Sequence, residues 1–241
     1  MSSAEEYRVT GVVIGGSNYR EKDKLITIFS LELGKISALL KGVNGANSKL
    51  KYASQPFCFA VFELVKKGDF FIVTQVSAID NFFELTENYD NFIEASYMLK
   101  LCNNYIKSGM VSEQLFISFI NCLKAITYDN ASAQVVVAQF ILRFLDCLGY
   151  ALDFSTCSKC EAKLYNGNLS LVHGGLICEN CLSFEKNDFN VQEIGLKKQE
   201  FAYLKIINNT TPAKLKNIKV KQIVAGELLK TLKDYLGYVL N

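Results

Sequence analysis

The sequence has few of the residues on which most enzyme mechanisms depend. It contains one histidine, His173, so a serine–histidine–aspartate arrangement would have to use that single imidazole. It also lacks a Walker phosphate loop, a GxGxxG turn after a strand, and the HExxH and GxSxG motifs. These absences argue against an enzyme, and we expect a binding protein.

Long apolar runs are absent as well. No stretch approaches the roughly 20 uninterrupted apolar residues that a membrane-spanning helix needs. The segment from Met1 to Arg8 is polar and acidic, without the basic and apolar regions of a signal peptide. Half of all residues are nevertheless apolar and only 21% are charged, which favours a folded chain over a disordered one. We therefore expect a soluble, cytoplasmic protein.

Arginine is scarce, and the charges are unevenly distributed. Any contact with phosphate groups would rely mainly on lysine, which lacks the bidentate geometry of arginine. Residues 1–80 carry 10 basic and 8 acidic side chains, residues 81–190 carry 7 and 12, and residues 191–241 carry 9 and 4. The basic ends allow contact with a polyanion, although solvated lysine-rich faces would give the same counts.

The first third of the chain has the pattern of β-strands. Apolar and β-branched segments alternate with short glycine-containing turns, as in strands joined by hairpins. The predicted strands cover residues 8–14, 25–29, 35–40, 57–65 and 70–77. The run Gly15-Gly16-Ser17-Asn18 is expected to end the first of them. Five strands of this length favour a small barrel of the oligonucleotide-binding (OB) type.

Beyond residue 81 the apolar residues recur at intervals of three and four, which is the period of a helix. Helices are predicted over residues 89–101, 115–123 and 135–148, and near residues 195–207 and 220–238. Gly149 follows the third helix as a C-terminal glycine, and Pro212 is placed near a helix start. We therefore expect an α+β protein. It would have a five-stranded OB barrel in residues 1–80 and a mainly α-helical domain in residues 81–241.

The eight cysteines fall into two groups of four. One group lies singly within apolar segments, where cysteine behaves as a small buried hydrophobic residue; its members are Cys58, Cys102, Cys122 and Cys147. The other group forms two pairs, Cys157-x2-Cys160 and Cys178-x2-Cys181, separated by seventeen residues. This is the spacing of a four-cysteine zinc site, because two tight turns can direct four sulfurs at one ion.

A zinc knuckle over residues 157–181 is therefore predicted. The alternative, a pair of redox CxxC motifs, would normally have one pair at a helix start beside a βαβ pattern, which the sequence lacks. Four cysteines leave no open coordination position, so the zinc is expected to be structural. Residues 164–169 are predicted to form a hairpin around Asn166-Gly167, and His173 is expected at the surface or in a hairpin.

Several segments, taken in order, resemble the RecO family. They are Arg8–Val13, Tyr19-Arg20-Glu21-Lys22-Asp23, Gly34–Val43, Gln55-Pro56-Phe57, Gly174–Cys181 and Leu228-Leu229 with Tyr235-Leu236-Gly237. The resemblance implies an N-terminal OB barrel and a helical domain carrying the zinc knuckle. It also implies a recombination mediator that binds single- and double-stranded DNA and anneals complementary strands. The implied partners are RecR, the single-strand-binding protein SSB and, indirectly, RecA.

The resemblance directs attention to the basic and aromatic residues of the barrel. Candidate phosphate contacts are Arg20, Lys22, Lys24, Lys35, Lys41, Lys49 and Lys51. Candidate base-stacking side chains are Tyr19 and Tyr52, which we expect in loops beside these lysines. The chain departs from the family at two places. The arginine-rich stretch after the third strand is reduced to two lysines in residues 44–51, and little of the usual basic tail follows the last helix.

Other functions fit the same residues. An RNA- or ribosome-associated protein could combine an OB barrel with a zinc knuckle, because lysine does not distinguish ribose from deoxyribose. A zinc-containing protein-interaction module would explain the acidic middle of the chain. A metalloenzyme would require activity that is lost on chelation without loss of the fold.

Overall fold

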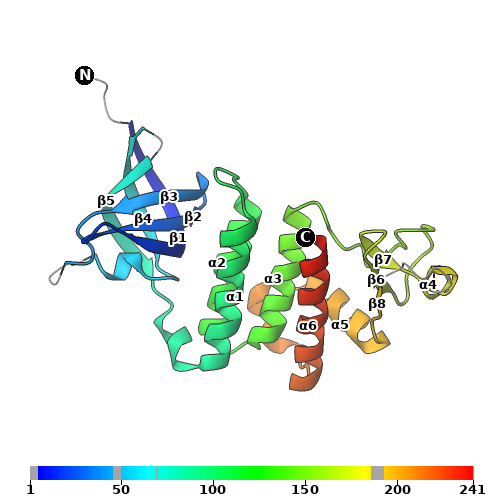
Figure 1. The fold of residues 1–241 in the computed structure, drawn as a ribbon. Coiled ribbons are helices and arrows are strands. Elements are labelled where there is room, and N and C mark those ends of the chain that lie inside the picture. Colours follow the sequence, from blue (N-terminus) through cyan, green and yellow to red (C-terminus); the bar gives the residue numbers. More distant parts are fainter. Residues whose placement is uncertain (1–4, 46–49, 69, 186–192, 241) are drawn as a thin grey trace. The chain divides into compact units, whose positions relative to one another are not determined.

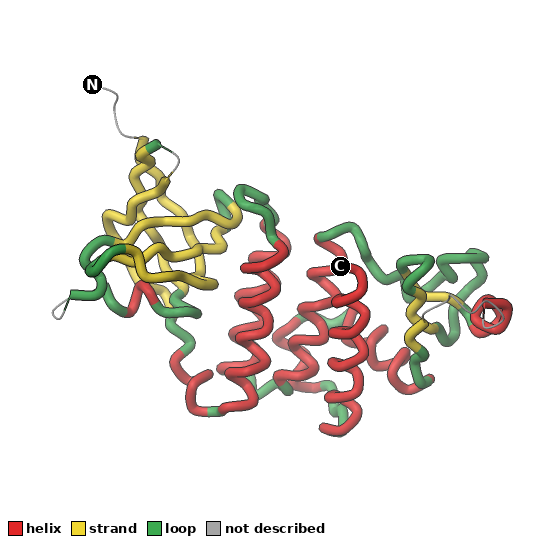
Figure 2. Tube along the Cα trace, viewed as in Figure 1, coloured by secondary structure: helices red, strands yellow, loops and turns green. Residues whose placement is uncertain are grey.

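The computed structural model of the protein describes residues 5–45, 50–68, 70–185 and 193–240. A strand-rich N-terminal part is followed by helices and by a small sheet near the cysteine pairs (Figures 1 and 2). The chain divides into two compact units, residues 1–120 and 121–241, and the boundary falls inside helix α2 (Glu113–Thr127). None of the described helices has the length and hydropathy to span a membrane.

Five strands of the first unit form a barrel. They are β1 (Glu5–Tyr19), β2 (Asp23–Ser30), β3 (Gly34–Leu40), β4 (Phe59–Lys67) and β5 (Phe70–Asp80). The order is β1-β2-β3-β5-β4, and β1 also pairs with β4, so the sheet closes on itself. All neighbouring strands are antiparallel except β3 and β5. The predicted OB-like barrel is confirmed.

Strand β1 does not end at the glycine pair where the sequence predicted a turn. It continues to Tyr19, with a shift of register between Val13 and Gly15 that marks a β-bulge. A Cβ atom at Gly16 would lie 2.9 Å from the carbonyl oxygen of Leu25, so the neighbouring strand passes too close for a side chain. Glycine at this position permits a close strand approach, and the prediction of a turn was wrong.

Alternate residues of the strands fill the barrel. On β2, Ile26 and Ile28 are completely buried inside it, whereas Phe29 points outward. Phe29 is nevertheless buried, because its ring packs edge-on against Phe116 and Phe119 of α2, with centroids 5.4 and 6.1 Å away. Helix α2 therefore covers part of the outer face of the barrel within the first unit.

Helix α1 (Tyr89–Tyr105), which follows the 3-10 helix η2 (Phe83–Glu87), also contacts the barrel. The segment between α1 and α2 runs beside the start of β3, where the amide of Gly109 donates a hydrogen bond to the Lys35 carbonyl (2.9 Å). A Cβ atom at Gly34 would lie 2.0 Å from the carbonyl oxygen of Met110. The barrel and this segment approach so closely only because residue 34 has no side chain.

The second unit contains the remaining helices and three short strands. The helices are α3 (Ala133–Cys147), α4 (Glu179–Glu185), α5 (Lys198–Asn208), the 3-10 helix η3 (Pro212–Asn217) and α6 (Gln222–Val239). The strands are β6 (Asn168–Ser170), β7 (Gly175–Ile177) and β8 (Glu193–Ile194), in the order β7-β6-β8. Helix α3 is buried on nearly all sides and packs against α5 and α6. Pro212 begins η3, as expected for a helix start.

Two local predictions for this unit have different outcomes. Gly149 follows α3 with a φ of +87°, so the expected C-terminal glycine is confirmed. The hairpin predicted around Asn166-Gly167 is wrong, because the turn that joins β6 to β7 lies at residues 171–174 and contains His173. Gly174, with a φ of +59°, supplies the left-handed residue of that turn.

The isolated cysteines mostly occupy the positions that their apolar surroundings predicted. Cys58, Cys102 and Cys122 are buried, and Cys147 is half-buried. The division of the chain into a barrel domain, 1–80, and a helical domain, 81–241, stays a prediction. Strand β5 ends at Asp80, whereas the first compact unit continues to residue 120.

Replacing Gly34 by alanine should destabilise the protein more than the same change at Gly42. Both glycines have a left-handed backbone, with φ of +65° and +66°, so both substitutions carry the same strain of about 1–2 kcal/mol. Only the alanine at residue 34 would also collide with the Met110 carbonyl, whereas nothing lies within 4 Å at residue 42. Thermal unfolding should therefore show a larger decrease in Tm for Gly34→Ala. Equal decreases would contradict the close approach.

Candidate nucleic-acid interface and metal centre

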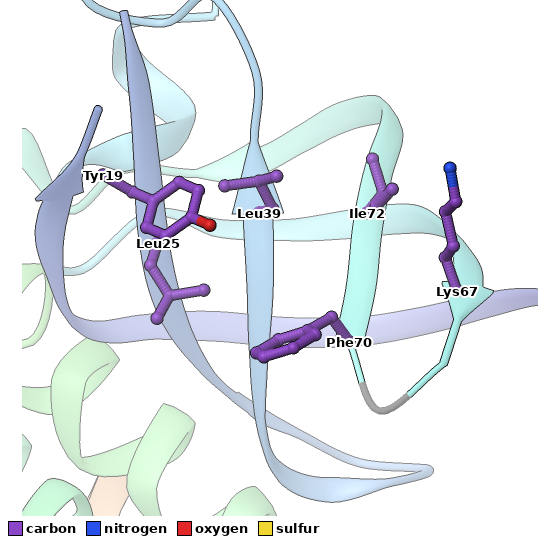
Figure 3. A pocket seen from close by; sticks show the side chains of 6 residues that line it. All are labelled: Tyr19, Leu25, Leu39, Lys67, Phe70 and Ile72. Carbon is purple, nitrogen blue, oxygen red and sulfur yellow. The ribbon is translucent and has the colours of Figure 1, made fainter. Parts of the chain in front are cut away.

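A shallow apolar groove lies on the outer face of the barrel. Its floor is a row of three aliphatic side chains, Leu25 on β2, Leu39 on β3 and Ile72 on β5, and they are neighbours because Leu25 pairs with Leu39 and Leu39 with Ile72. Figure 3 shows this row from β2 to β5. In OB barrels, the face of the second and third strands and the β1–β2 and β4–β5 loops bind oligonucleotides and oligosaccharides. The groove lies on this face.

Two exposed aromatic rings flank the row. Tyr19 comes from the end of β1 and Phe70 from the start of β5, and Lys67 at the end of β4 completes the lining (Figure 3). The groove has a volume of about 180 Å³. Exposed aromatic rings above an apolar floor are the surface on which unpaired bases stack, because every base has a π-face. Lysine beside the rings supplies the positive charge that a phosphate needs.

Arg20 holds an unusual backbone conformation beside the groove. Its φ is +57°, in the left-handed region that non-glycine residues rarely adopt. In this conformation the guanidinium carbon lies 5.3 Å from the centre of the Tyr19 ring. The contact is a cation–π interaction. A positive charge and an exposed ring are thereby held together at the end of the β1–β2 hairpin.

Hydrogen bonds attach the loop after β3 to this hairpin. The amide of Gly42 donates to the Asp23 carboxylate (2.8 Å), and the amide of Asn44 donates to the carbonyl of Lys22 (3.0 Å). The loop therefore presents Lys41 on the same hairpin end as Lys22, and both side chains are exposed. We call these two lysines and Arg20 the basic rim; they lie around the turn that follows Tyr19, with the exposed side chain of Glu21 between Arg20 and Lys22 in the chain.

The other candidate residues occupy different environments. Lys24 donates a hydrogen bond to the Ser54 carbonyl (3.0 Å) and is half-buried, whereas Lys51 is exposed. Tyr52 is half-buried against the barrel core, and its hydroxyl donates to the Val76 carbonyl (3.2 Å). Lys49 lies outside the described residues. The structure therefore leaves Tyr19, and little of Tyr52, available for stacking.

Lys35 is engaged in the contact between barrel and helix. Its ammonium group donates to the Asn103 carbonyl in the last turn of α1 (2.8 Å). Burial lowers the pKa of Lys35, although the nearby Cys102 acts in the opposite direction. A lysine bonded to the carboxyl end of a helix satisfies a free carbonyl group and interacts favourably with the helix dipole.

Two residues that line the groove, Lys67 and Phe70, were not predicted as site residues from the sequence. The signal that could have found them is Lys66-Lys67-Gly68-Asp69-Phe70-Phe71, a basic turn followed by two aromatic residues. In a strand, two successive residues face opposite sides. One of the two phenylalanines must therefore face outward, next to the lysines of the turn.

In the second unit, the four paired cysteines come together. Their sulfur atoms all lie within 4.8 Å of one another, with 3.9 Å between Cys157 and Cys181 and 3.8 Å between Cys160 and Cys178. Four sulfurs at about 2.3 Å from a central zinc ion would be about 3.8 Å apart in a regular tetrahedron. A disulfide would need about 2.0 Å. The arrangement thus fits a tetrahedral metal ion, and none of these cysteines forms a disulfide.

Close backbone contacts shape this cluster. The amide of Ser158, inside the first CxxC turn, donates to the Leu176 carbonyl on β7 (2.8 Å). A Cβ atom at Gly175 would lie 2.2 Å from the Ser158 hydroxyl oxygen, so glycine allows the turn to rest on β7. Cys178 follows β7 directly and Cys181 lies in the first turn of α4. The first CxxC turn is thus held against β7, and the second pair, Cys178 and Cys181, lies where β7 leads into α4. This brings the two cysteine pairs together.

The thiols of the cluster differ in acidity. Burial opposes ionisation of Cys157, but amides of Cys160, Cys178 and Lys159 donate hydrogen bonds that together lower its pKa to about 6. Burial and hydrogen bonds with the other thiols raise the pKa of Cys181. Metal ions bind thiolates, so an incoming ion would displace the remaining protons.

Comparison with known proteins agrees with this architecture. The model of the "Recombination protein O N terminal" family matches residues 1–82, and the "Recombination protein O C terminal" model matches residues 86–241. The chain belongs to the RecO family. DNA repair protein RecO of Caldicellulosiruptor saccharolyticus is 30% identical over 97% of this chain and 93% of its own length. The RecO proteins of Acetivibrio thermocellus and Clostridium perfringens are each 29% identical over 95% of the chain, and cover 90% and 91% of their own lengths.

Replacing Lys35 by methionine should lower stability, whereas Lys41→Met should not. The first change removes the charged hydrogen bond to the end of α1, which contributes about 1 kcal/mol in this half-buried position. Lys41 is exposed on its loop. Urea unfolding of both variants measures the difference directly. A stable Lys35→Met variant with weakened DNA binding would instead assign Lys35 to the interface.

Proposed function

We propose that the protein acts in DNA repair as a non-enzymatic recombination mediator in the cytoplasm. It would bind single- and double-stranded DNA, anneal complementary strands, and assist RecA loading together with RecR on SSB-coated DNA. The observation that supports DNA binding best is the groove with its two exposed rings and basic rim. Membership of the RecO family, and relatives named DNA repair protein RecO, support the same role.

The chemistry of the groove favours unpaired bases of any sequence. The three floor residues are aliphatic and offer no hydrogen-bonding group to a base edge, so contact would be by stacking and apolar burial. Sequence-specific proteins instead read base edges with polar side chains. Lys67, Arg20, Lys22 and Lys41 would neutralise phosphates along the strand, with release of counterions.

Annealing follows from the same arrangement. Two complementary strands repel one another through their phosphates, and a protein surface that neutralises part of this charge lowers the repulsion. Bases held by stacking keep their Watson–Crick edges available, because stacking uses only the faces of the ring. Neither step forms or breaks a covalent bond, which agrees with the expectation of a protein without catalytic activity.

We further propose that the four cysteines hold a structural Zn²⁺. Zinc accepts four thiolates in a closed tetrahedron, and the sulfur separations fit that geometry. The ligands come from two distant turns, so the ion would stabilise residues 157–181 in a part of the chain with only short strands and one short helix. Bound zinc would supply no reaction chemistry here.

The annealing proposal is tested by mixing two labelled complementary strands with the protein over a series of salt concentrations. Pairing should be faster than without protein at low salt, and the acceleration should fade as salt rises, because phosphate contacts release counterions. A competing RNA strand of the same sequence tests the RNA-binding alternative. Absence of acceleration by the folded protein would reject annealing, and preferential binding of RNA would favour the alternative.

Removing the Phe70 ring should weaken single-strand binding about tenfold, since stacking on one aromatic side chain contributes about 1–3 kcal/mol per base. Phe70→Ala should leave the salt dependence unchanged, because no charge is lost. Lys67→Met should instead reduce the slope of the logarithm of the binding constant against the logarithm of salt concentration, by the amount expected for one lost phosphate contact. Fluorescence anisotropy of a labelled oligonucleotide measures both. Exposed Tyr165→Ala, in the second unit, is the control. If the Phe70→Ala variant bound single-stranded DNA as tightly as the wild type, the groove would be excluded as the site of base stacking.

Metal removal should destabilise the second unit. The purified protein should contain one zinc per chain by mass spectrometry, and Cys157→Ser or Cys181→Ser should lose it. Chelation of the wild type should lower Tm, because metal binding contributes to folding free energy. Cys147→Ser, which changes a half-buried cysteine outside the cluster, should retain the zinc. Full metal content in both ligand variants would disprove the site.

A further inference from the structure

Three large apolar side chains are exposed where the barrel meets helix α1. Phe83 on η2 is 70% exposed, and Tyr89 and Ile93 on the first two turns of α1 are 76% and 45% exposed. Tyr89 and Ile93 are four residues apart, so they lie on one face of the helix. We call these three residues the η2–α1 surface. Large apolar side chains that stay exposed in one segment offer apolar area that a partner can bury.

The backbone beneath this surface is firmly held. Phe82 is buried, with a left-handed backbone (φ of +47°), and its amide donates to the Asp80 carboxylate (2.8 Å). The amide of buried Leu85 donates to the Phe82 carbonyl (3.0 Å). The Asn88 side chain then caps α1 by accepting from the Asn91 amide (3.0 Å). The exposed rings thus project from a fixed scaffold, which limits the entropy lost when a partner binds.

The charged side chains of the segment that carries these three residues are all acidic up to Lys100, which is exposed two turns of α1 beyond Ile93. Residues 68–99 contain no lysine, arginine or histidine. The carboxylates of this segment that accompany the surface are Asp80, Glu84, Glu87, Asp90 and Glu94. Glu84, Glu87 and Asp90 are exposed. Such a surface repels the phosphates of DNA and of anionic lipids, and attracts a cationic partner.

We propose that the η2–α1 surface docks a basic segment of a partner protein, in which lysine or arginine residues accompany apolar anchors. Aromatic side chains in the centre of an interface provide most of the binding free energy. The acidic rim sets the choice of partner and the rate of encounter. A basic segment is therefore preferred over an acidic or neutral one with the same apolar residues.

The position of the surface permits simultaneous binding of DNA. Strand β5 begins at Phe70 in the groove and ends at Asp80 beside η2, so the two sites lie at opposite ends of this strand. Eleven residues of strand extend about 30 Å. One barrel could then hold a DNA strand at its basic end and a cationic protein at its acidic end.

The experiment is a selection of random displayed dodecapeptides on the full-length wild-type protein, with Phe83→Ser/Tyr89→Ser as counter-selection. Individual peptides that survive are then measured by fluorescence anisotropy. We expect sequences with at least three lysine or arginine residues and at least one large apolar residue, binding the wild type at least tenfold more tightly than the variant. Glu84→Gln/Glu87→Gln should weaken these peptides several-fold and flatten their salt dependence. The matched control, Tyr165→Ser/Ile223→Ser, replaces two side chains that are each 78% exposed in the second unit, and should bind like the wild type.

Other outcomes would overturn the proposal. They are a selection in which no peptide distinguishes wild type from Phe83→Ser/Tyr89→Ser, or one that yields neutral or acidic peptides. Self-association of the wild type in the analytical ultracentrifuge that the double variant abolishes would assign the surface to a second copy of the chain. Circular dichroism must show that the variant is folded. The Phe83→Ser/Tyr89→Ser variant should accelerate strand annealing as the wild type does. This result would show that the η2–α1 surface and the DNA groove act independently.

Discussion

The outer row of strand β2 determines how the first unit is built. Leu25, Thr27 and Phe29 face away from the barrel interior. The barrel strands therefore cannot bury the Phe29 ring, and another element must pack against it. Helix α2 covers Phe29, while Leu25 at the other end remains half-buried and contributes to the groove floor. The same strand face thus supports the helices at one end and presents a binding surface at the other. Glycine at residue 34 allows the connection between α1 and α2 to lie against β3.

Much of this architecture was predictable because its signals are local. Alternation identified the five strands, the three-to-four spacing identified the main helices, and the CxxC spacing identified the four cysteines that the structure brings together. The groove was not predictable in the same way. Its floor depends on the parallel pairing of β3 with β5, a contact between residues more than thirty positions apart in the chain. In the sequence, Lys35 looks like an ordinary basic residue at a strand end, and Tyr52 like an ordinary aromatic loop residue. Only their tertiary contacts with Asn103 and Val76 show that they support the fold.

The two wrong local predictions share a physical cause. Glycine-rich runs were interpreted as turns, although glycine also serves wherever two backbones approach closely. Gly16 has this second role in the β1–β2 ladder, and Gly167 has it against the ring of Phe201, where a Cβ atom would lie 3.1 Å from the ring. A sequence shows that a side chain is missing. It does not show whether the missing atom frees a dihedral angle or makes room for a neighbour.

The burial of Phe29 bears on where the chain can be cut. A fragment that stops at Asp80, at the end of the last barrel strand, would retain the pairings among the five barrel strands. It would leave the rings of Phe29 and Phe57 without Phe116, Phe119 and Phe92. Such a fragment would expose an apolar aromatic surface and would tend to aggregate in concentrated solution. A fragment that keeps Phe116 and Phe119 against Phe29 must extend into α2, past Phe119, where the first compact unit also ends.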